Sequence, residues 1–316
     1  MDLIDDRQAI DILLASKLEI FHHYAEPEPL AANALLSKIT DEDVFTVDIK
    51  LADLGMASTQ HNRLAIASHL YPSMHFKLGT SIINPPAEVH RMQKGDRYYI
   101  GDLYSADMLI SCLEKNKINM LPDHYYLDFG CSSGSLLRIL KAYEPAANLF
   151  GVDPIRSSVE WAQRNVRGVD FSTSNVKPPL PYGMGTFHGV SAVSIWSHLG
   201  EVEAISWFDE MHRIIKPNGW LFFTTHGDSS LHFYNREGLY LPRRILALLE
   251  GLVNSNFVFE EVYLGESPEG LSADGYGNAY MRPSWVKKNL SEKWKILYFG
   301  PAENQGNQDT YVLARI

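Results

Sequence analysis

The stretch Tyr125–Leu140, YYLDFGCSSGSLLRIL, limits most strongly what this chain can fold into. It opens with a short apolar run, Tyr125–Phe129, which carries Asp128 and predicts a buried strand. A turn with Gly130 and Gly134 follows, and glycines let the backbone take positive φ and approach a ligand closely. The apolar spacing after the turn predicts an amphipathic helix, whose first N–H groups have no partner within the helix. The stretch therefore predicts the strand–turn–helix unit that many nucleotide-binding α/β folds share.

The glycine spacing in this turn separates two kinds of nucleotide site. A dinucleotide fingerprint needs glycines at the first, third and sixth positions of G-x-G-x-x-G. Those positions hold Gly130, Ser132 and Ser135 here. The match is poor, and a nicotinamide cofactor is disfavoured on this ground.

Strands and helices alternate along the chain from about residue 100. Such alternation indicates a parallel sheet covered by helices. The last two strands, 294–299 and 310–314, are joined too tightly for a crossover helix, so we expect them to be antiparallel. The fold class is therefore predicted to be α/β, a doubly wound, mostly parallel seven-stranded sheet with one antiparallel strand. The other expected strands lie at 125–129, 149–152, 169–172, 190–196 and 220–225, and the expected helices at 106–114, 136–143, 157–165, 202–215 and 283–292.

Residues 1–95 are interpreted as an N-terminal accessory region whose fold the pattern does not define. Apolar residues at helical spacing predict a helix over 10–24, and an apolar–polar alternation predicts a strand over 44–54. The main domain is expected to span 96–316, with an insertion at 226–282.

The composition limits the kinds of molecule that the chain can bind and the compartment in which we expect it. The chain has 28 Lys and Arg against 38 Asp and Glu, a net charge of −10, which disfavours binding to nucleic acid or to an anionic membrane. Its two cysteines cannot form a disulfide framework, and its acidic N-terminus does not resemble a signal peptide. These features predict a cytoplasmic protein. No histidine pattern has the spacing of a metal site, so no metal is predicted.

Four ordered elements resemble those of class I S-adenosylmethionine-dependent methyltransferases, which have a Rossmann-like fold. The first is Asp128-Phe129-Gly130-Cys131-Ser132-Ser133-Gly134, with Ser132 in place of the family's middle glycine. The second is the strand that ends at Asp153, followed by Pro154, and the third is Ser174-Asn175-Val176. The fourth is the helix–turn–strand 214–221. The resemblance implies S-adenosylmethionine as the cofactor, held by Asp128, Gly130, Cys131, Ser132, Gly134, Asp153, Pro154, Ser174, Asn175, Val176, Ser194 and Trp196.

Within that resemblance, Asp153 is expected to bind the ribose hydroxyls and Asn175 to lie near the adenine amine. Cys131 is interpreted as a small packing residue in the cofactor turn. Trp196 has two equal interpretations, as a ring packed on the adenine or as an ordinary core tryptophan.

Two histidines are candidates for catalysis. His198 and His226 follow the fourth and fifth expected strands, at the sheet edge where open α/β sheets bind ligands. Histidine titrates near neutral pH, so either could act as a general base. Packing alone explains either one equally well.

The predicted function is methyl transfer from S-adenosylmethionine to a hydroxyl or amine of a small molecule. The segments SIWSHLGE, TTHG and QDTYVLAR resemble methyltransferases associated with glycan and secondary-metabolite synthesis, which implies a sugar or glycan precursor as acceptor. The Tyr-rich insertion suits a lid over a ring-shaped acceptor, or else a surface elaboration or a homodimer contact. A nicotinamide-dependent sugar-nucleotide oxidoreductase or epimerase, and a non-catalytic cofactor-binding partner subunit, remain as alternatives.

Overall fold

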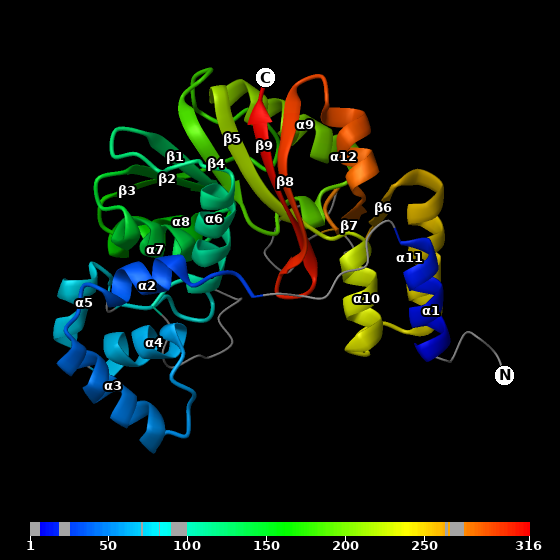
Figure 1. The fold of residues 1–316 in the computed structure, drawn as a ribbon. Helices are drawn as coiled ribbons and strands as arrows, with labels where there is room; N and C mark the ends of the chain where they lie inside the picture. The colour runs from blue at the N-terminus through cyan, green and yellow to red at the C-terminus, as the bar shows by residue number, and fades with distance from the viewer. Residues whose placement is uncertain are drawn as a thin grey trace. The chain divides into compact units, whose positions relative to one another are not determined.

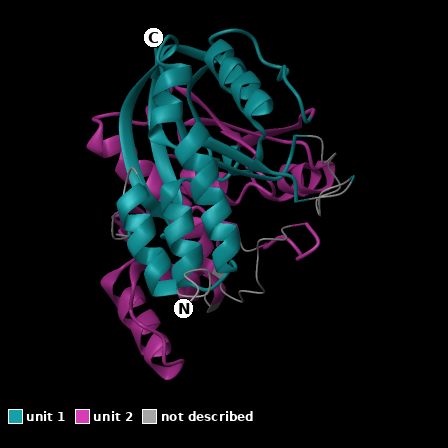
Figure 2. Ribbon diagram, turned by 90° about the vertical axis from the view of Figure 1, so that its right-hand side faces the viewer, with its two compact units in different colours: residues 1–26, 176–316 teal, residues 27–175 magenta. Residues whose placement is uncertain are grey.

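The computed structural model of the chain forms two compact units, coloured separately in Figure 2. Unit 1 comprises residues 1–26 and 176–316, and unit 2 comprises residues 27–175. The residues that the structure describes are 7–18, 26–70, 72–81, 83–89, 100–262, 265 and 275–316. The boundary expected near residue 95 lies outside these residues.

The strands confirm the predicted fold class. They form a seven-stranded sheet in the order β3-β2-β1-β4-β5-β9-β8 (Figure 1). The pairs β1–β2, β2–β3 and β4–β5 are parallel, whereas β9 is antiparallel to both of its neighbours. The sheet is therefore mixed, with one reversed strand. The strands are β1 (Tyr125–Phe129), β2 (Asn148–Asp153), β3 (Val169–Thr173), β4 (Phe187–Ala192), β5 (Ile215–Thr225), β8 (Trp294–Asn304) and β9 (Gln308–Arg315).

Unit 2 contains the first three strands and most of the accessory helices. Helices α7 and α8 pack against β2, and α8 also packs against β3. Helix α2 packs against α4, α6 and α7, so the accessory helices share a core with the nucleotide-type strands. The helices of this unit are α2 (Leu30–Leu36), α3 (Asp41–Asp53), α4 (Gln60–Leu70), α5 (Pro72–Leu78), α6 (Leu103–Lys115), α7 (Ser135–Tyr143) and α8 (Arg156–Asn165).

The strand predicted over 44–54 is wrong, because this segment lies in helix α3. Thr40 and Asp43 form a capping box, with the Thr40 hydroxyl accepting from the Asp43 N–H at 3.1 Å. Only Val47 and Leu51 of the alternating apolar residues are buried, one helical turn apart. The local cap and the i, i+4 pair therefore outweigh the alternation.

A buried carboxylate ties α2 to α6. Asp107 is fully buried on α6 and accepts hydrogen bonds from the N–H groups of Ala31 and Ala32, at 2.6 and 3.1 Å. Its second oxygen lies 2.5 Å from Nε2 of His61 on α4. Because the first N–H groups of a helix lack intrahelical partners, Asp107 satisfies donors that burial would otherwise leave unpaired.

Unit 1 joins the rest of the sheet to the insertion and to the first helix. Ile10 and Leu14 of α1 pack with Leu231, Ile245 and Leu252 of the insertion in one apolar cluster. The helix expected over 10–24 is α1 (Arg7–Lys17), and residues 19–25 lie outside the described part of the chain. The remaining elements are η1 (Trp196–His198), α9 (Glu201–Ile214), α10 (Asp228–Arg236), α11 (Pro242–Ser255), α12 (Pro283–Leu290) and the antiparallel pair β6 (Phe257–Glu260) and β7 (Asn278–Met281).

Candidate active site

The turn after β1 has the backbone shape that its glycines predict. Gly130 and Gly134 have φ of 80° and 76°, and Ser132, at the middle glycine position, has φ of 48°. A Cβ on Gly134 would lie 2.7 Å from Cζ of Phe171, closer than packed atoms come. Gly134 is therefore required both by its φ and by the aromatic ring against it. Ser132 holds a left-handed conformation that costs a non-glycine residue free energy.

Asp153 ends β2 and shapes the same turn. Its carboxylate accepts a hydrogen bond from the Ser132 N–H at 2.8 Å and another from the Ile155 N–H at 2.8 Å. The side chain is 6 % exposed. A carboxylate has about four acceptor positions, so these two bonds leave capacity for ribose hydroxyls. Pro154 lies between Asp153 and Ile155 in the chain.

The residues after β3 complete the first half of the candidate site. The Ser174 N–H donates to the carbonyl of Asp153 at 3.1 Å, and Asn175 is exposed next to it. The Ser174 hydroxyl is buried and has no hydrogen-bond partner among the residues that the structure describes. An unsatisfied buried hydroxyl of this kind fits a site that receives a polar ligand. Val176 follows, 46 % exposed.

Burial defines the state of the cysteine in the turn. Cys131 is 3 % exposed, and burial, together with the negative charges of Asp153 and Asp128, raises the pKa of its thiol well above the usual value. A thiol in this state is neither ionised nor nucleophilic at neutral pH. Its packing role agrees with the interpretation from the sequence. Asp128 is likewise buried, at 4 % exposure.

The residues of the turn and of the two neighbouring strand ends are chemically suited to hold S-adenosylmethionine. Close approach of the backbone is possible because Gly130 and Gly134 carry no side chains. A carboxylate, Asp153, stands at the end of the next strand, and an unsatisfied hydroxyl, Ser174, stands at the end of the third. All four residues follow the carboxyl ends of parallel strands in unit 2, where open α/β sheets bind ligands.

His198 lies in unit 1, in the one-turn helix η1 that follows β4. The predicted strand is shorter than expected and ends at Ala192. Nδ1 of His198 lies 2.9 Å from the carbonyl oxygen of Gly277, and the ring stacks on Tyr276 with centroids 5.1 Å apart. Because a carbonyl only accepts, Nδ1 carries the hydrogen of the neutral ring and Nε2 is the basic atom.

His226 follows β5 and is deeply buried, at 6 % exposure. Burial, and then the nearby His198, lower the pKa of His226 to about 3, so the ring is neutral. Its Nε2 lies 3.1 Å from the Tyr234 hydroxyl, and the ring stacks on Tyr280. The two histidine rings have centroids 6.5 Å apart and lie edge to face. The structure thus brings the two candidates together but gives them different surroundings.

Gln308, which the sequence interpretation did not single out, connects this cluster. Its Nε2 lies 2.7 Å from Ser194 Oγ and 3.4 Å from His226 Nε2, and its Oε1 accepts from the Thr224 hydroxyl at 2.7 Å. Gln308 begins β9, and an antiparallel last strand starts at the edge where β5 ends. The sequence holds this signal in QDTYVLAR, but only the pairing of β9 with β5 places the amide. Ser194 itself has φ of 61° and donates its N–H to Thr224.

Trp196 belongs to the core, which favours the second of its two interpretations. The side chain is fully buried and stacks on Phe208 with centroids 4.5 Å apart. Its Nε1 donates to the carbonyl of Ala204 at 3.2 Å. The ring has no exposed face to offer an adenine.

Some aromatic residues of the insertion are buried in the core and others are partly exposed. Tyr280 is fully buried and Tyr234 is 8 % exposed, and both belong to the apolar cluster around α1. They act as core residues, which differs from the lid expected for them. Tyr276 and Tyr240 are only half-buried. Tyr263 lies outside the described residues.

Comparison with known proteins gives one family match and a set of solved structures of low similarity. Residues 100–255 match the model of a family described as a methyltransferase domain. The chain is also similar to three solved structures. A SAM-dependent methyltransferase from Methanosarcina mazei shares 16 % identity, over 65 % of this chain and 97 % of that one, with a TM-score of 0.45. One from Aquifex aeolicus shares 12 %, over 74 % and 100 %, with a TM-score of 0.43. The magnesium protoporphyrin IX methyltransferase of Synechocystis PCC 6803, solved with bound SAH, shares 16 %, over 67 % and 82 %, with a TM-score of 0.44.

Residues 100–255, just under half of the chain, match a methyltransferase domain. Together with the mixed sheet and the glycine turn after β1, this match supports a class I S-adenosylmethionine-dependent methyltransferase. This identification sets aside the nicotinamide-dependent alternative. Among the described residues, no helix is long and apolar enough to cross a membrane, and no three His, Cys, Asp or Glu side chains are grouped to hold a metal.

Proposed function

We propose that the enzyme methylates a hydroxyl or amine of a small molecule, with His198 as the general base. The observation that carries the proposal is the 2.9 Å contact between His198 Nδ1 and the Gly277 carbonyl. In the neutral ring this contact places the hydrogen on Nδ1, so Nε2 is the atom that would take a proton. His226, with its pKa near 3, stays neutral and serves as a packing and hydrogen-bonding neighbour.

When bound, S-adenosylmethionine supplies an electrophilic methyl group on a sulfonium. The chain's own residues then have two tasks, to position the acceptor and to remove its proton. Positioning supplies much of the acceleration of such a displacement, and a general base contributes further when the attacking atom is a hydroxyl oxygen or an amine nitrogen. In this proposal His198 Nε2 takes the proton of the attacking group.

A sugar or a similar ring-shaped molecule is the acceptor class that we propose. The half-buried Tyr276 ring beside His198 offers an aromatic surface, and Asn278 Nδ2 lies 3.5 Å from the Tyr240 hydroxyl on the same insertion. The net charge of −10 supports a small acceptor over nucleic acid or an anionic membrane surface. We propose that the enzyme acts in the cytoplasm. A homodimer stays a prediction.

The test is an acceptor panel with S-adenosylmethionine labelled in its methyl group. Sugars, sugar nucleotides, phenols and small amines would be compared with RNA and with denatured protein as acceptors. We expect label in at least one small molecule, with that transfer lost in His198→Ala. Label that enters only RNA or protein would refute the proposal.

A further inference from the structure

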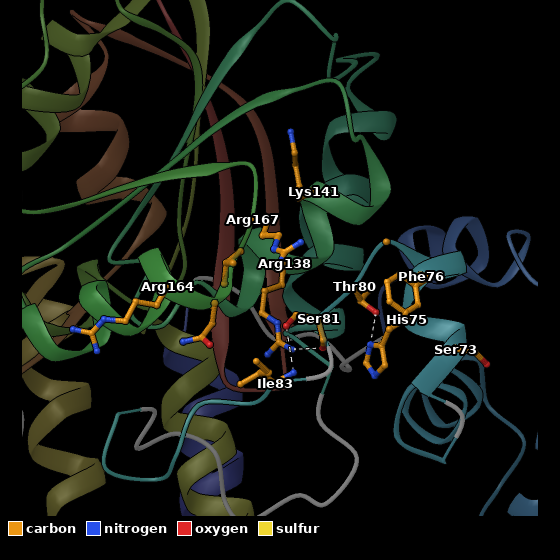
Figure 3. A pocket seen from close by; sticks show the side chains of 13 residues that line it. Ser73, His75, Phe76, Thr80, Ser81, Ile83, Arg138, Lys141, Arg164 and Arg167 are labelled. Atoms are coloured by element: carbon orange, nitrogen blue, oxygen red, sulfur yellow. Dashed lines mark hydrogen bonds between the residues drawn. The ribbon is translucent and has the colours of Figure 1, made fainter.

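A cavity that contains none of the cofactor-turn residues lies in unit 2. Its volume is about 720 Å³, and its walls come from α5, the segment after it, α7 and the end of α8 (Figure 3). Its described lining contains three arginines and a lysine but no aspartate or glutamate. These cationic residues are Arg138, Lys141, Arg164 and Arg167.

The position of the cavity distinguishes it from the cofactor site. Its α8 side is formed by residues 164–167, immediately before β3 begins at Val169. Val169 pairs with Leu149 near the start of β2, whereas Asp153 ends that strand. Leu149 and Asp153 are four residues apart along β2, which is about 13 Å at the rise per residue of a strand. The α8 side of the cavity therefore lies near the amino ends of the strands, whereas the cofactor residues lie at the carboxyl ends.

The four cations do not contribute equally. Figure 3 shows Lys141 and Arg164 extending away from Arg138. Lys141 donates to the carbonyl of Ala147, and Arg164 pairs with Glu160. Neither is aimed at a ligand in the cavity.

Arg138 and Arg167 are the cations that the cavity can use. Arg138 is 3 % exposed, and its guanidinium donates to the Ser81 carbonyl at 2.8 Å and to Asn84 Oδ1 at 3.2 Å, both uncharged acceptors. Arg138 also lines the cavity, so its charge lies at the cavity wall. Arg167 is exposed and forms no ion pair with any residue in the described ranges. The cavity can thus use one buried arginine, Arg138, whose position is held by hydrogen bonds, and one exposed arginine, Arg167.

Apolar side chains form the rest of the cavity surface. Phe76 is 91 % exposed and Ile83 is 52 % exposed, although both line the cavity. An aromatic ring and an aliphatic side chain beside two guanidinium groups suit a ligand with an apolar body and an acidic group.

We propose that this cavity binds a small organic anion, with a phosphate, sulfonate or carboxylate group near Arg138 and Arg167 and an apolar ring or chain against Phe76. Such a site is additional to methyl transfer, since it contains none of the cofactor residues. The exposed Arg167 guanidinium selects the acidic group, because arginine binds oxyanions through paired N–H donors, whereas the buried Arg138, whose guanidinium already donates to protein acceptors, contributes its charge.

The test uses 8-anilinonaphthalene-1-sulfonate as the probe, with the full-length chain and fluorescence titration. Arg167→Ala and Phe76→Ser replace exposed side chains, so neither should disturb folding. We expect Arg167→Ala to weaken binding by about fivefold, the upper end for one partly exposed charge pair. We expect Phe76→Ser to weaken it severalfold, through the loss of apolar contact. Arg156→Ala is the matched control, because Arg156 is another exposed arginine, on α8, that does not line the cavity, and we expect no change.

Two further measurements make the result decisive. Inorganic phosphate should compete with the sulfonate probe, and the uncharged N-phenyl-1-naphthylamine should bind at least fivefold more weakly. Equal binding of the probe by wild type, Arg167→Ala and Phe76→Ser would overturn the proposal, as would equal binding of the uncharged analogue. Affinity for S-adenosylhomocysteine should be unchanged in all variants. If the wild-type protein did not bind S-adenosylhomocysteine, that result would count against the cofactor site and not against this cavity.

Discussion

Gly277 holds His198 by two hydrogen bonds, one to the ring and one to the backbone. His198 Nδ1 lies 2.9 Å from the Gly277 carbonyl oxygen, and the Gly277 N–H donates to the His198 carbonyl at 2.8 Å. A Cβ on Gly277 would lie 2.2 Å from the carbonyl oxygen of Glu260, so no larger residue fits without a shift. The insertion therefore fixes both the place and the tautomer of the proposed base.

Replacing His198 should affect turnover far more than cofactor binding. We expect His198→Ala to slow methyl transfer by roughly a hundredfold or more, the scale of a general base. Affinity for S-adenosylhomocysteine should stay within about twofold of wild type, since the proposed proton transfer involves only the acceptor. Single-turnover kinetics with an identified acceptor, and calorimetry for the product, measure the two quantities.

His226→Ala is the comparison for that prediction. Because His226 is buried and neutral, we expect this variant to lose about 2–3 kcal/mol of stability, as for other large-to-small core changes. Turnover per folded molecule should fall much less than in His198→Ala. Near-normal turnover in His198→Ala would remove His198 from the catalytic role.

Asp153 should matter chiefly for the cofactor. It holds the Ser132 and Ile155 N–H groups and is also the expected ribose ligand. We expect Asp153→Ala to weaken S-adenosylhomocysteine binding by about 1.5–3 kcal/mol, the cost of removing a charged hydrogen-bond partner. Asp153→Asn should fall between wild type and alanine, because one amide oxygen can replace only part of the carboxylate. Unchanged affinity in Asp153→Ala, measured by calorimetry, would exclude it as a ligand.

The glycine turn was predictable from the sequence because its chemistry is local. Gly130, Gly134 and Asp153 act through backbone conformation and strand ends, and both follow from residue type and order. The helix over Asp41–Asp53, in contrast, was not predictable from the apolar–polar alternation, which indicated a strand over 44–54. There the Thr40 capping box was the stronger local signal, and four residues of spacing placed Val47 and Leu51 on one helical face.

Long-range contacts account for what the sequence could not show. Gln308 joins Ser194 and His226 only because β9 runs antiparallel to β5, which brings residues more than 80 positions apart into contact. Likewise, α1 packs into the insertion through Ile10 and Leu14, and no pattern in the first residues indicates that partner. Residue type alone did not decide between the two interpretations of Trp196. Its complete burial in the structure favours a core tryptophan.

The two unusual positions of the cofactor turn should respond in opposite ways. Gly134→Ala places a Cβ 2.7 Å from Phe171 at a φ of 76°, so we expect a loss of roughly 2–4 kcal/mol and weaker cofactor binding. Ser132→Gly relieves a φ of 48°, and this gain slightly exceeds the entropy that glycine adds to the unfolded chain. We expect that variant to be up to about 1 kcal/mol more stable than wild type. Urea unfolding compares the two, and a clear loss in Ser132→Gly would show that its side chain is needed.

Asp309 should make stability depend on pH. It is 2 % exposed, and its Oδ1 accepts the Ala302 N–H at 3.0 Å. Burial, with a smaller contribution from the Asp228 charge, raises the pKa of its carboxyl to about 7, although bonds from Ser229 and Ala302 act the other way. Asp228 is itself paired with Arg282 at 2.8 Å. The folded protein therefore binds a proton at Asp309 that the unfolded chain has released above about pH 4.

The sign of the effect follows from proton binding. Between about pH 4 and 7 the folded state holds more protons at Asp309 than the unfolded state, so its contribution to stability falls as pH rises. Asp309→Asn removes this titration and keeps an acceptor for the Ala302 N–H. We expect the stability of Asp309→Asn, relative to wild type, to improve by roughly 2–3 kcal/mol between pH 5 and pH 8. His226, whose folded pKa near 3 gives the opposite slope below about pH 6.5, is present in both proteins and cancels in the difference. Urea unfolding at pH 5, 6, 7 and 8 measures it, and a difference that stays constant with pH would mean that Asp309 is ionised in the folded enzyme throughout.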